Sequence, residues 1–176
     1  MKQLRDYQKK AYDAAFKEMS NGVGKQIVVL PTGAGKTLLA SRIASNFKKI
    51  LFMTHVEELM SQSGIALIEE FYPEMLIKER VKEHGDIIEY FRHVEKNKLF
   101  VPIEQQNKFG IIKADLFKID TQITLASYQT IHKKLDRIPR DFFDLVIIDE
   151  CHLSSSRTAS MTCNYLSPKL LLGLTA

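Results

Sequence analysis

The sequence predicts an α/β fold with a doubly wound, mainly parallel β-sheet and helices on both faces. Short apolar runs rich in β-branched residues alternate along the chain with segments of helical periodicity. Runs that are apolar at every position are typical of parallel strands buried on both faces. A glycine-containing loop joins the first of these runs to a helical segment, which is the order of a strand–loop–helix unit. With 176 residues and a hydrophobic fraction of 45%, the chain suits one globular domain.

The elements follow from the N-terminus in a regular order. Residues 4–19 place Leu4, Tyr7, Ala11, Ala14 and Ala15 at helical spacing, which predicts an amphipathic helix that the following glycines end. A second helix is expected from residue 36 to about residue 46. Strands are expected at residues 27–30, 50–53, 123–126, 145–148 and 170–174, with residues 110–112 as a weaker candidate.

Between residues 69 and 109 the pattern predicts an α-rich insertion. Ile87, Phe91 and Val94 fit one helix face, and charged residues surround them. Residues 78–98 hold six basic and five acidic side chains, so their net charge is near zero. This balance favours a solvated helical segment over a basic patch for nucleic acid. His84 and His93 lie in it without neighbouring ligand residues, which indicates surface histidines.

Charge and cysteine content narrow the class of protein. The formal net charge is +4, which permits a nucleic-acid partner and equally fits an ordinary solvated surface. Two cysteines, Cys151 and Cys163, are too few for a disulfide framework, and they do not form the Cys-x-x-Cys pair that would suggest zinc. The chain shows neither a signal peptide nor an apolar run of about 20 residues that a membrane span needs. A cytoplasmic protein with no membrane partner is therefore expected.

A phosphate-binding loop follows the first predicted strand and opens the next helix. Gly33 and Gly35 permit backbone angles that direct successive amides at phosphate oxygens. The helix beginning near Lys36 adds its N-terminal N–H groups, Lys36 can reach the β- and γ-phosphates, and the Thr37 hydroxyl can ligate Mg²⁺. We expect the residues that bind ATP here to be Thr32, Gly33, Ala34, Gly35, Lys36 and Thr37.

Leu30 departs from this loop pattern, because the strict motif has glycine at that position. The alternative is a glycine-rich turn that binds no ligand. In such a turn a lysine and several amides would converge on nothing, so the phosphate-loop interpretation is favoured.

Two carboxylates end the predicted strand at residues 145–148. Because ligands of α/β folds bind at the carboxyl edge of the sheet, Asp149 is suited to hold Mg²⁺, and Glu150 to orient and deprotonate the attacking water. Alone, the pair also fits a solvated turn, but together with the phosphate loop it completes one Mg–nucleotide site. His152 either senses the nucleotide state or caps the turn, and Cys151 is interpreted as a small packed residue.

These motifs together resemble the superfamily 2 helicases, and the resemblance spans most of the chain. It implies a RecA-like domain that fills residues 1–176, with Arg5 and Gln8 at the adenine and Gln8 reading its edge. The matching segments are Leu-Arg-Asp-Tyr-Gln at 4–8, the loop at 31–37, Leu-Phe-Met-Thr-His at 51–55, residues 124–130, the Asp-Glu-Cys-His box at 149–152 and Gly-Leu-Thr-Ala at 173–176.

The resemblance also implies a nucleic-acid surface and a coupling element. The expected nucleic-acid contacts are Thr54, His55, Ser127, Tyr128 and Gln129. The alternative for Thr54 and Ser127 is that they cap the following helices. Thr175 and Ala176, in the segment similar to motif III, are expected to couple nucleotide state to movement.

Within that superfamily the chain looks closest to type I and type III restriction motor subunits and related DNA repair helicases. Cys151 stands where alanine is more usual, and Asp6 where proline is frequent. The implied function is the ATP-binding half of a DNA helicase or translocase, with DNA favoured over RNA. The implied partners are a second RecA-like domain and nuclease or specificity subunits.

Three alternative functions stay open from the sequence. They are a DExH RNA helicase, a nucleotide-gated scaffold for a nuclease, and a phosphate-loop enzyme or switch that never meets nucleic acid. The last has no need of the Gln8 element or of the turn at residues 127–130. Because an arginine from a second motor domain contributes roughly 10³–10⁵ in rate, we expect the chain alone to bind nucleotide weakly and hydrolyse it slowly.

Overall fold

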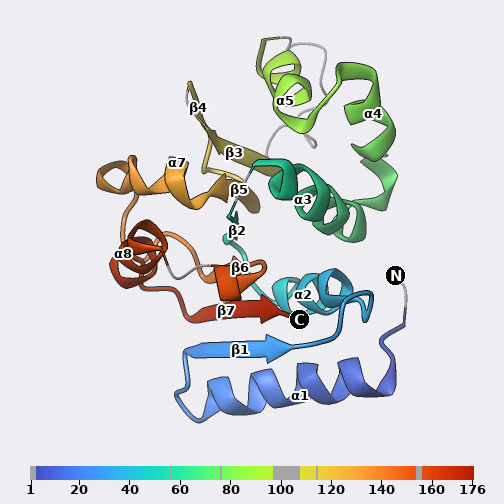
Figure 1. Cartoon of the computed structure of the whole chain (residues 1–176), viewed down its shortest axis with the longest axis vertical. Coiled ribbons are helices and arrows are strands. Elements are labelled where there is room, and N and C mark those ends of the chain that lie inside the picture. Colours follow the sequence, from blue (N-terminus) through green and yellow to red (C-terminus); the bar gives the residue numbers. More distant parts are fainter. Residues whose placement is uncertain (1–2, 56, 76, 97–107, 114, 154–155) are drawn as a thin grey trace.

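A mixed, mostly parallel sheet organises the chain in a computed structural model that describes residues 3–55, 57–75, 77–96, 108–113, 115–153 and 156–176 (Figure 1). The sheet has seven strands in the order β1-β7-β6-β2-β5-β3-β4, and β4 alone runs antiparallel to its neighbour. The strands are β1 (Lys25–Val29), β2 (Ile50–Thr54), β3 (Phe109–Lys113), β4 (Leu116–Phe117), β5 (Ile123–Ser127), β6 (Leu145–Ile148) and β7 (Leu170–Thr175). All six predicted strands are confirmed, and β4 was not predicted.

Helices cover both faces of this sheet, as the sequence predicts. Alternate residues of β2 show the two faces, because Ile50 and Phe52 join one buried cluster while Leu51 and Met53 join a second. The first cluster includes residues of α1 (Asp6–Ser20), α2 (Lys36–Ala44) and α3 (Glu57–Phe71). The second includes residues of α7 (Tyr128–His132) and α8 (Arg157–Tyr165). Short 3₁₀ turns lie at η3 (Leu135–Arg137) and η4 (Cys151–Leu153).

The segment between α3 and β3 is helical where it is described. It contains η1 (Pro73–Met75), α4 (Ile77–His84) and α5 (Ile87–Lys96), which lie at the end of the molecule opposite β1 in Figure 1. Ile87, Phe91 and Val94 are buried in the first cluster, so the predicted helix face packs against the domain. His93 is exposed, and the half-buried His84 bonds through Nδ1 to the Arg80 carbonyl at 2.8 Å. Residues 97–107 of the expected insertion lie outside the described residues.

The parallel register brings the carboxyl ends of five strands to one edge. Val29 of β1 is level with Thr175 of β7, and Thr54 of β2 is level with Ser127 of β5. Ile148, the last residue of β6, pairs with Met53 of β2 on one side and with β7 on the other. The loops that carry the predicted motifs therefore emerge side by side.

None of the helices in the described part of the chain is both long enough and apolar enough to cross a membrane.

Candidate nucleotide-binding site

The phosphate loop leaves β1 and enters α2 through two left-handed glycines. Gly33 has φ 76° and Gly35 has φ 79°, a region that side-chain-bearing residues rarely adopt. The Ala34 N–H donates to the Pro31 carbonyl at 3.0 Å, which closes a tight turn inside the loop. Gly35 is the N-cap of α2, so the first N–H groups of that helix face the loop. Such a cradle of amides is suited to phosphate oxygens.

The first turn of α1 holds this loop from the side. The Gln8 side chain is only 2% exposed, and its Nε2 donates to the Ala34 carbonyl at 2.8 Å and to the Gly35 carbonyl at 3.3 Å. Its Oε1 accepts from the Arg5 backbone N–H at 2.8 Å. In this structure the Gln8 amide therefore bonds to the loop and to its own helix start.

Tyr7 is a site residue that the sequence analysis missed. Its hydroxyl donates to the Ala34 carbonyl at 3.0 Å and lies 3.1 Å from Nη1 of Arg5, which donates to it. Helical spacing placed Tyr7 on the buried face of α1, yet its side chain is 40% exposed. Its position directly before Gln8 was the available signal.

An ion pair joins the phosphate loop to the acidic end of β6. Lys36 Nζ lies 2.7 Å from Glu150 Oε1, and the two side chains are 12% and 28% exposed. Asp149 is buried beside them, and its Oδ1 accepts from the Glu150 N–H at 3.1 Å. Glu150 has φ 46°, a left-handed backbone angle that its position between β6 and η4 imposes. The two halves that the sequence analysis expected to form one site are in contact.

His152 links this acidic turn to the end of β7. Its Nδ1 lies 2.7 Å from Thr175 Oγ1 and 3.4 Å from Glu150 Oε2. The His152 side chain is 53% exposed, so it lies at the surface of the site. Ala176, the next residue after Thr175, is exposed.

The donor set of the site fits a hard cation and a polyphosphate. Thr37 supplies a hydroxyl in the first turn of α2, and Asp149 and Glu150 supply carboxylates at the same edge of the sheet. Mg²⁺ prefers such oxygen ligands and binds through few protein groups. Among the described residues, no group of three or more His, Cys, Asp or Glu side chains is placed to hold a metal ion by itself.

The residues expected to contact nucleic acid divide into two groups. Thr54, Ser127 and Tyr128 have buried side chains, with exposures of 0%, 4% and 1%. Burial leaves these three side chains little exposed surface, and their expected contacts with nucleic acid, which include the loop amides at the strand ends, stay a prediction. His55 is half-buried and Gln129 is exposed, so these two side chains remain accessible.

The Ser127 side chain contacts a neighbouring residue of α7. Ser127 is the N-cap of α7 but makes no side-chain hydrogen bond to the N–H groups of that helix, and its Oγ lies 2.8 Å from Thr130 Oγ1.

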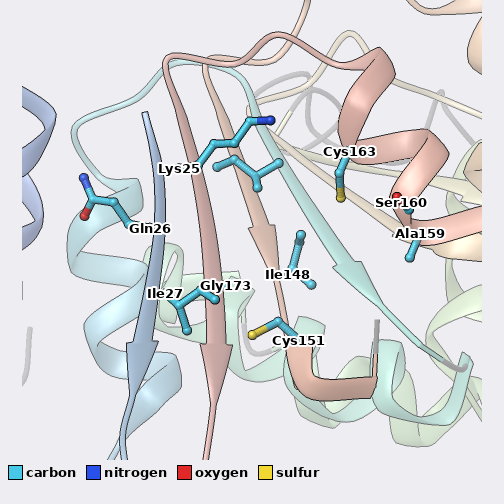
Figure 2. Close-up of a pocket in the computed structure, with 10 residues that line it drawn as sticks. Lys25, Gln26, Ile27, Ile148, Cys151, Ala159, Ser160, Cys163 and Gly173 are labelled. Carbon is cyan, nitrogen blue, oxygen red and sulfur yellow. The ribbon is translucent and has the colours of Figure 1, made fainter. Parts of the chain in front are cut away.

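A hollow of about 450 Å³ lies on the sheet face between β1 and α8, away from the phosphate loop (Figure 2). Cys151 and Cys163 both line it, and burial raises the pKa of both thiols. A raised thiol pKa disfavours a nucleophile. The interpretation of Cys151 as a packed residue agrees with its place against Gly173, where an added Cβ would lie 2.9 Å from Cys151 Sγ.

The fold and the arranged motifs define the class: a RecA-like nucleotide-binding domain of the superfamily 2 helicases. The chain belongs to the family of the type III restriction enzyme, res subunit, whose family model matches residues 1–176.

Curated relatives and solved structures are similar over the whole chain. The endonuclease subunit of the type I restriction enzyme EcoAI from Escherichia coli is 29% identical, covering 99% of this chain and 19% of the relative. The DNA 3'-5' translocase XPB2 of Sulfurisphaera tokodaii is 30% identical, covering 99% of this chain and 30% of the relative. The SWI2/SNF2 ATPase core of Sulfolobus solfataricus, solved with double-stranded DNA, superposes with a TM-score of 0.66 at 17% identity, covering 99% and 32% of the two chains. The chain thus spans less than a third of each of these proteins.

Proposed function

We propose that this domain is the ATP-binding half of a DNA helicase or translocase of the restriction or repair type. The observation that carries the proposal is the 2.7 Å contact between Lys36 of the phosphate loop and Glu150 of the acidic turn. It brings the phosphate-binding and water-activating groups of one ATPase site together. Family membership supports the helicase class, and the name of one relative, a DNA translocase, supports DNA over RNA.

In this proposal each residue of the site has a separate role in ATP hydrolysis. Residues 32–37 hold the phosphates through loop amides, with Lys36 reaching the β- and γ-phosphates. Thr37 and Asp149 would hold Mg²⁺, which neutralises phosphate charge when bound. Glu150 accepts the proton of the attacking water. Gln8 and Arg5, at the start of α1, lie on the adenine side of the loop in this proposal.

Nucleotide binding also changes the partners of the Lys36 ammonium. In the structure this group is paired with the Glu150 carboxylate at 2.7 Å. When Lys36 turns to phosphate oxygens, the Glu150 carboxylate is released to hold water and lies near His152 and Thr175. This exchange offers a path from the bound nucleotide to the end of β7, where Thr175 and Ala176 would couple it to movement.

Partners follow from the same proposal. A second RecA-like domain would supply the arginine that completes the site, and nuclease or specificity subunits would act with the motor, as in restriction systems. His55 and Gln129, the accessible residues of the expected set, would meet the DNA backbone.

Calorimetric titration of the chain with MgATP tests the nucleotide site. Wild type should bind, and Lys36→Ala should weaken binding at least about tenfold because a charge-assisted contact is lost. Glu150→Gln should bind as tightly or more tightly, since the competing carboxylate is neutralised. An affinity indifferent to Lys36→Ala would overturn the assignment of the loop.

Steady-state ATP hydrolysis tests the polymer. The rate is measured without nucleic acid and with single-stranded DNA, duplex DNA or RNA, in a protein that joins this chain to a second RecA-like domain, with Glu150→Gln as the blank. Stimulation chiefly by duplex DNA is the expected result. Stimulation by RNA alone would transfer the domain to the DExH RNA helicases, and a rate indifferent to every polymer would exclude the motor.

A further inference from the structure

Two side chains from the first turn of α1 converge on one carbonyl of the phosphate loop. Tyr7 Oη and Gln8 Nε2 lie 3.0 Å and 2.8 Å from the Ala34 oxygen, and both donate to it. Gln8 Nε2 also reaches the next carbonyl, that of Gly35, at 3.3 Å. Two successive peptide groups of the loop are therefore held from the same side.

Holding a carbonyl also orients the amide on the other side of its peptide bond. The peptide group is planar and trans, so the C=O of residue 34 and the N–H of residue 35 point in opposite directions. With the Ala34 oxygen directed at α1, the Gly35 N–H points away from α1. The same relation directs the Lys36 N–H away from the Gly35 oxygen. These are amides that a phosphate-binding loop must present to its ligand.

Both N–H donors of the Gln8 amide are already used in this arrangement. A primary amide offers two N–H donors and one oxygen. Both loop carbonyls take the donors, and the Arg5 N–H bonds the oxygen at 2.8 Å. A Cβ at Gly35 would lie 2.5 Å from Gln8 Nε2, so the loop glycine and the Gln8 amide are fitted to each other.

We propose that the first turn of α1 positions the phosphate loop for the polyphosphate part of the nucleotide, through Tyr7 and Gln8 acting on the Ala34 and Gly35 carbonyls. Both are positioning residues, and the role of Tyr7 rests on its 3.0 Å hydrogen bond to the Ala34 carbonyl. The inference rests on the proposed function, in which this loop binds ATP. It separates two roles of the turn, because positioning affects every ligand with a polyphosphate, whereas reading a base affects adenine nucleotides alone.

Tyr7→Phe is the sharpest test, since it removes only the hydroxyl of a side chain that is 40% exposed. Affinities for MgATP and for magnesium tripolyphosphate, which has no base, are measured by calorimetry on the 176-residue chain. Losing one hydrogen bond to the loop should weaken both ligands by about three- to tenfold, and by the same factor. The melting temperature should stay at the wild-type value. If Tyr7 only stabilised the fold, weaker binding would come with a lower melting temperature.

Tyr12→Phe is the matched control on the same helix. The Tyr12 hydroxyl accepts from Asn46 Nδ2 at 3.1 Å and does not reach the loop, so both affinities should be unchanged. Gln8→Glu is the second variant, because it keeps the shape and places a carboxylate oxygen against two carbonyls. It should weaken both ligands more than Tyr7→Phe.

The outcomes separate this inference from the proposed function. Wild-type affinity of Tyr7→Phe for tripolyphosphate would overturn the positioning role, and a loss confined to ATP would show that the turn reads the base instead. If the wild-type chain binds neither ligand, the proposed function fails and the inference fails with it. Equal weakening of both ligands in Tyr7→Phe, with Tyr12→Phe unchanged, supports it.

Discussion

Gly35 is constrained at the residue scale by its own backbone and by a neighbouring side chain. Its φ of 79° costs any side-chain-bearing residue backbone strain, and a Cβ there would meet Gln8 Nε2 at 2.5 Å. Gly22, just after α1, has a similar φ of 86° with nothing within 4 Å of its Cβ position. A side chain would therefore be strained at both positions, but it would contact another residue only at Gly35.

Gly35→Ala should lower the free energy of unfolding by more than Gly22→Ala does, because backbone strain acts at both positions and the contact with Gln8 only at Gly35. Strain alone is expected to cost about 1 kcal/mol of unfolding free energy, and displacing Gln8 adds to it. MgATP affinity should fall at least about tenfold, as the loop loses the amide that holds it. Urea unfolding and calorimetry of Gly35→Ala and Gly22→Ala measure both quantities. Equal losses of stability in the two variants, with nucleotide binding kept in Gly35→Ala, would contradict the prediction.

The sequence predicted the main chemical groups of the site and missed how they are held. The phosphate loop and the Asp149–Glu150 pair were expected to form one site, because both follow buried strands and ligands of α/β folds bind at the carboxyl edge of the sheet. Tyr7 was placed on the apolar helix face, since spacing alone does not tell that α1 begins at Asp6 and that its first turn lies beside the phosphate loop. The burial of Thr54 and Tyr128 depended on packing at the strand ends, which a motif does not encode.

At the scale of elements, the acidic turn (residues 149–152) packs against β7 where Cys151 approaches Gly173. A Cβ at Gly173 would lie 2.9 Å from Cys151 Sγ and 3.2 Å from Cys151 Cβ (Figure 2). Gly173 is buried in the middle of a strand, a position where glycine usually marks close approach of another segment. The close approach here is that of η4, which carries His152.

Gly173→Ala should therefore destabilise the chain through overpacking, by about 1–3 kcal/mol. Adding Cys151→Ala removes the nearest atom and should return a large part of that loss, so the two changes should be strongly non-additive. Urea unfolding of the wild type, both single variants and the double variant gives the coupling free energy. Simple addition of the two single losses would show that the turn does not rest on Gly173.

The strands themselves were predictable because most of them are buried on both faces. β2, β5 and β6 are buried at every position, which gives the continuous apolar runs that the sequence showed. β4 has two residues and no run to detect. β1 shows the opposite difficulty, since an apolar run does not tell whether a strand is central or at an edge.

At the scale of the whole molecule, β1 forms one edge of the sheet. It pairs with β7 on one side and has no strand partner on the other within the described chain. Ile27 and Val29 on this strand are 69% and 66% exposed, and the hollow of Figure 2 lies next to Ile27. An edge strand with exposed β-branched residues is a template for association with another chain.

We therefore expect the 176-residue chain to self-associate as its concentration rises, and Ile27→Lys to suppress this. A lysine on an edge strand opposes pairing by charge and by hydration. Light scattering coupled to size exclusion over a concentration series measures the effect.

Met161→Lys is the matched control, because it adds the same charge at an exposed apolar residue of α8, 46% exposed and away from the strand edge. A wild-type chain that stays monomeric throughout would contradict the prediction, and an equal effect of Met161→Lys would assign the association to net charge. Suppression by Ile27→Lys alone would locate it at β1, the strand that leads directly into the phosphate loop.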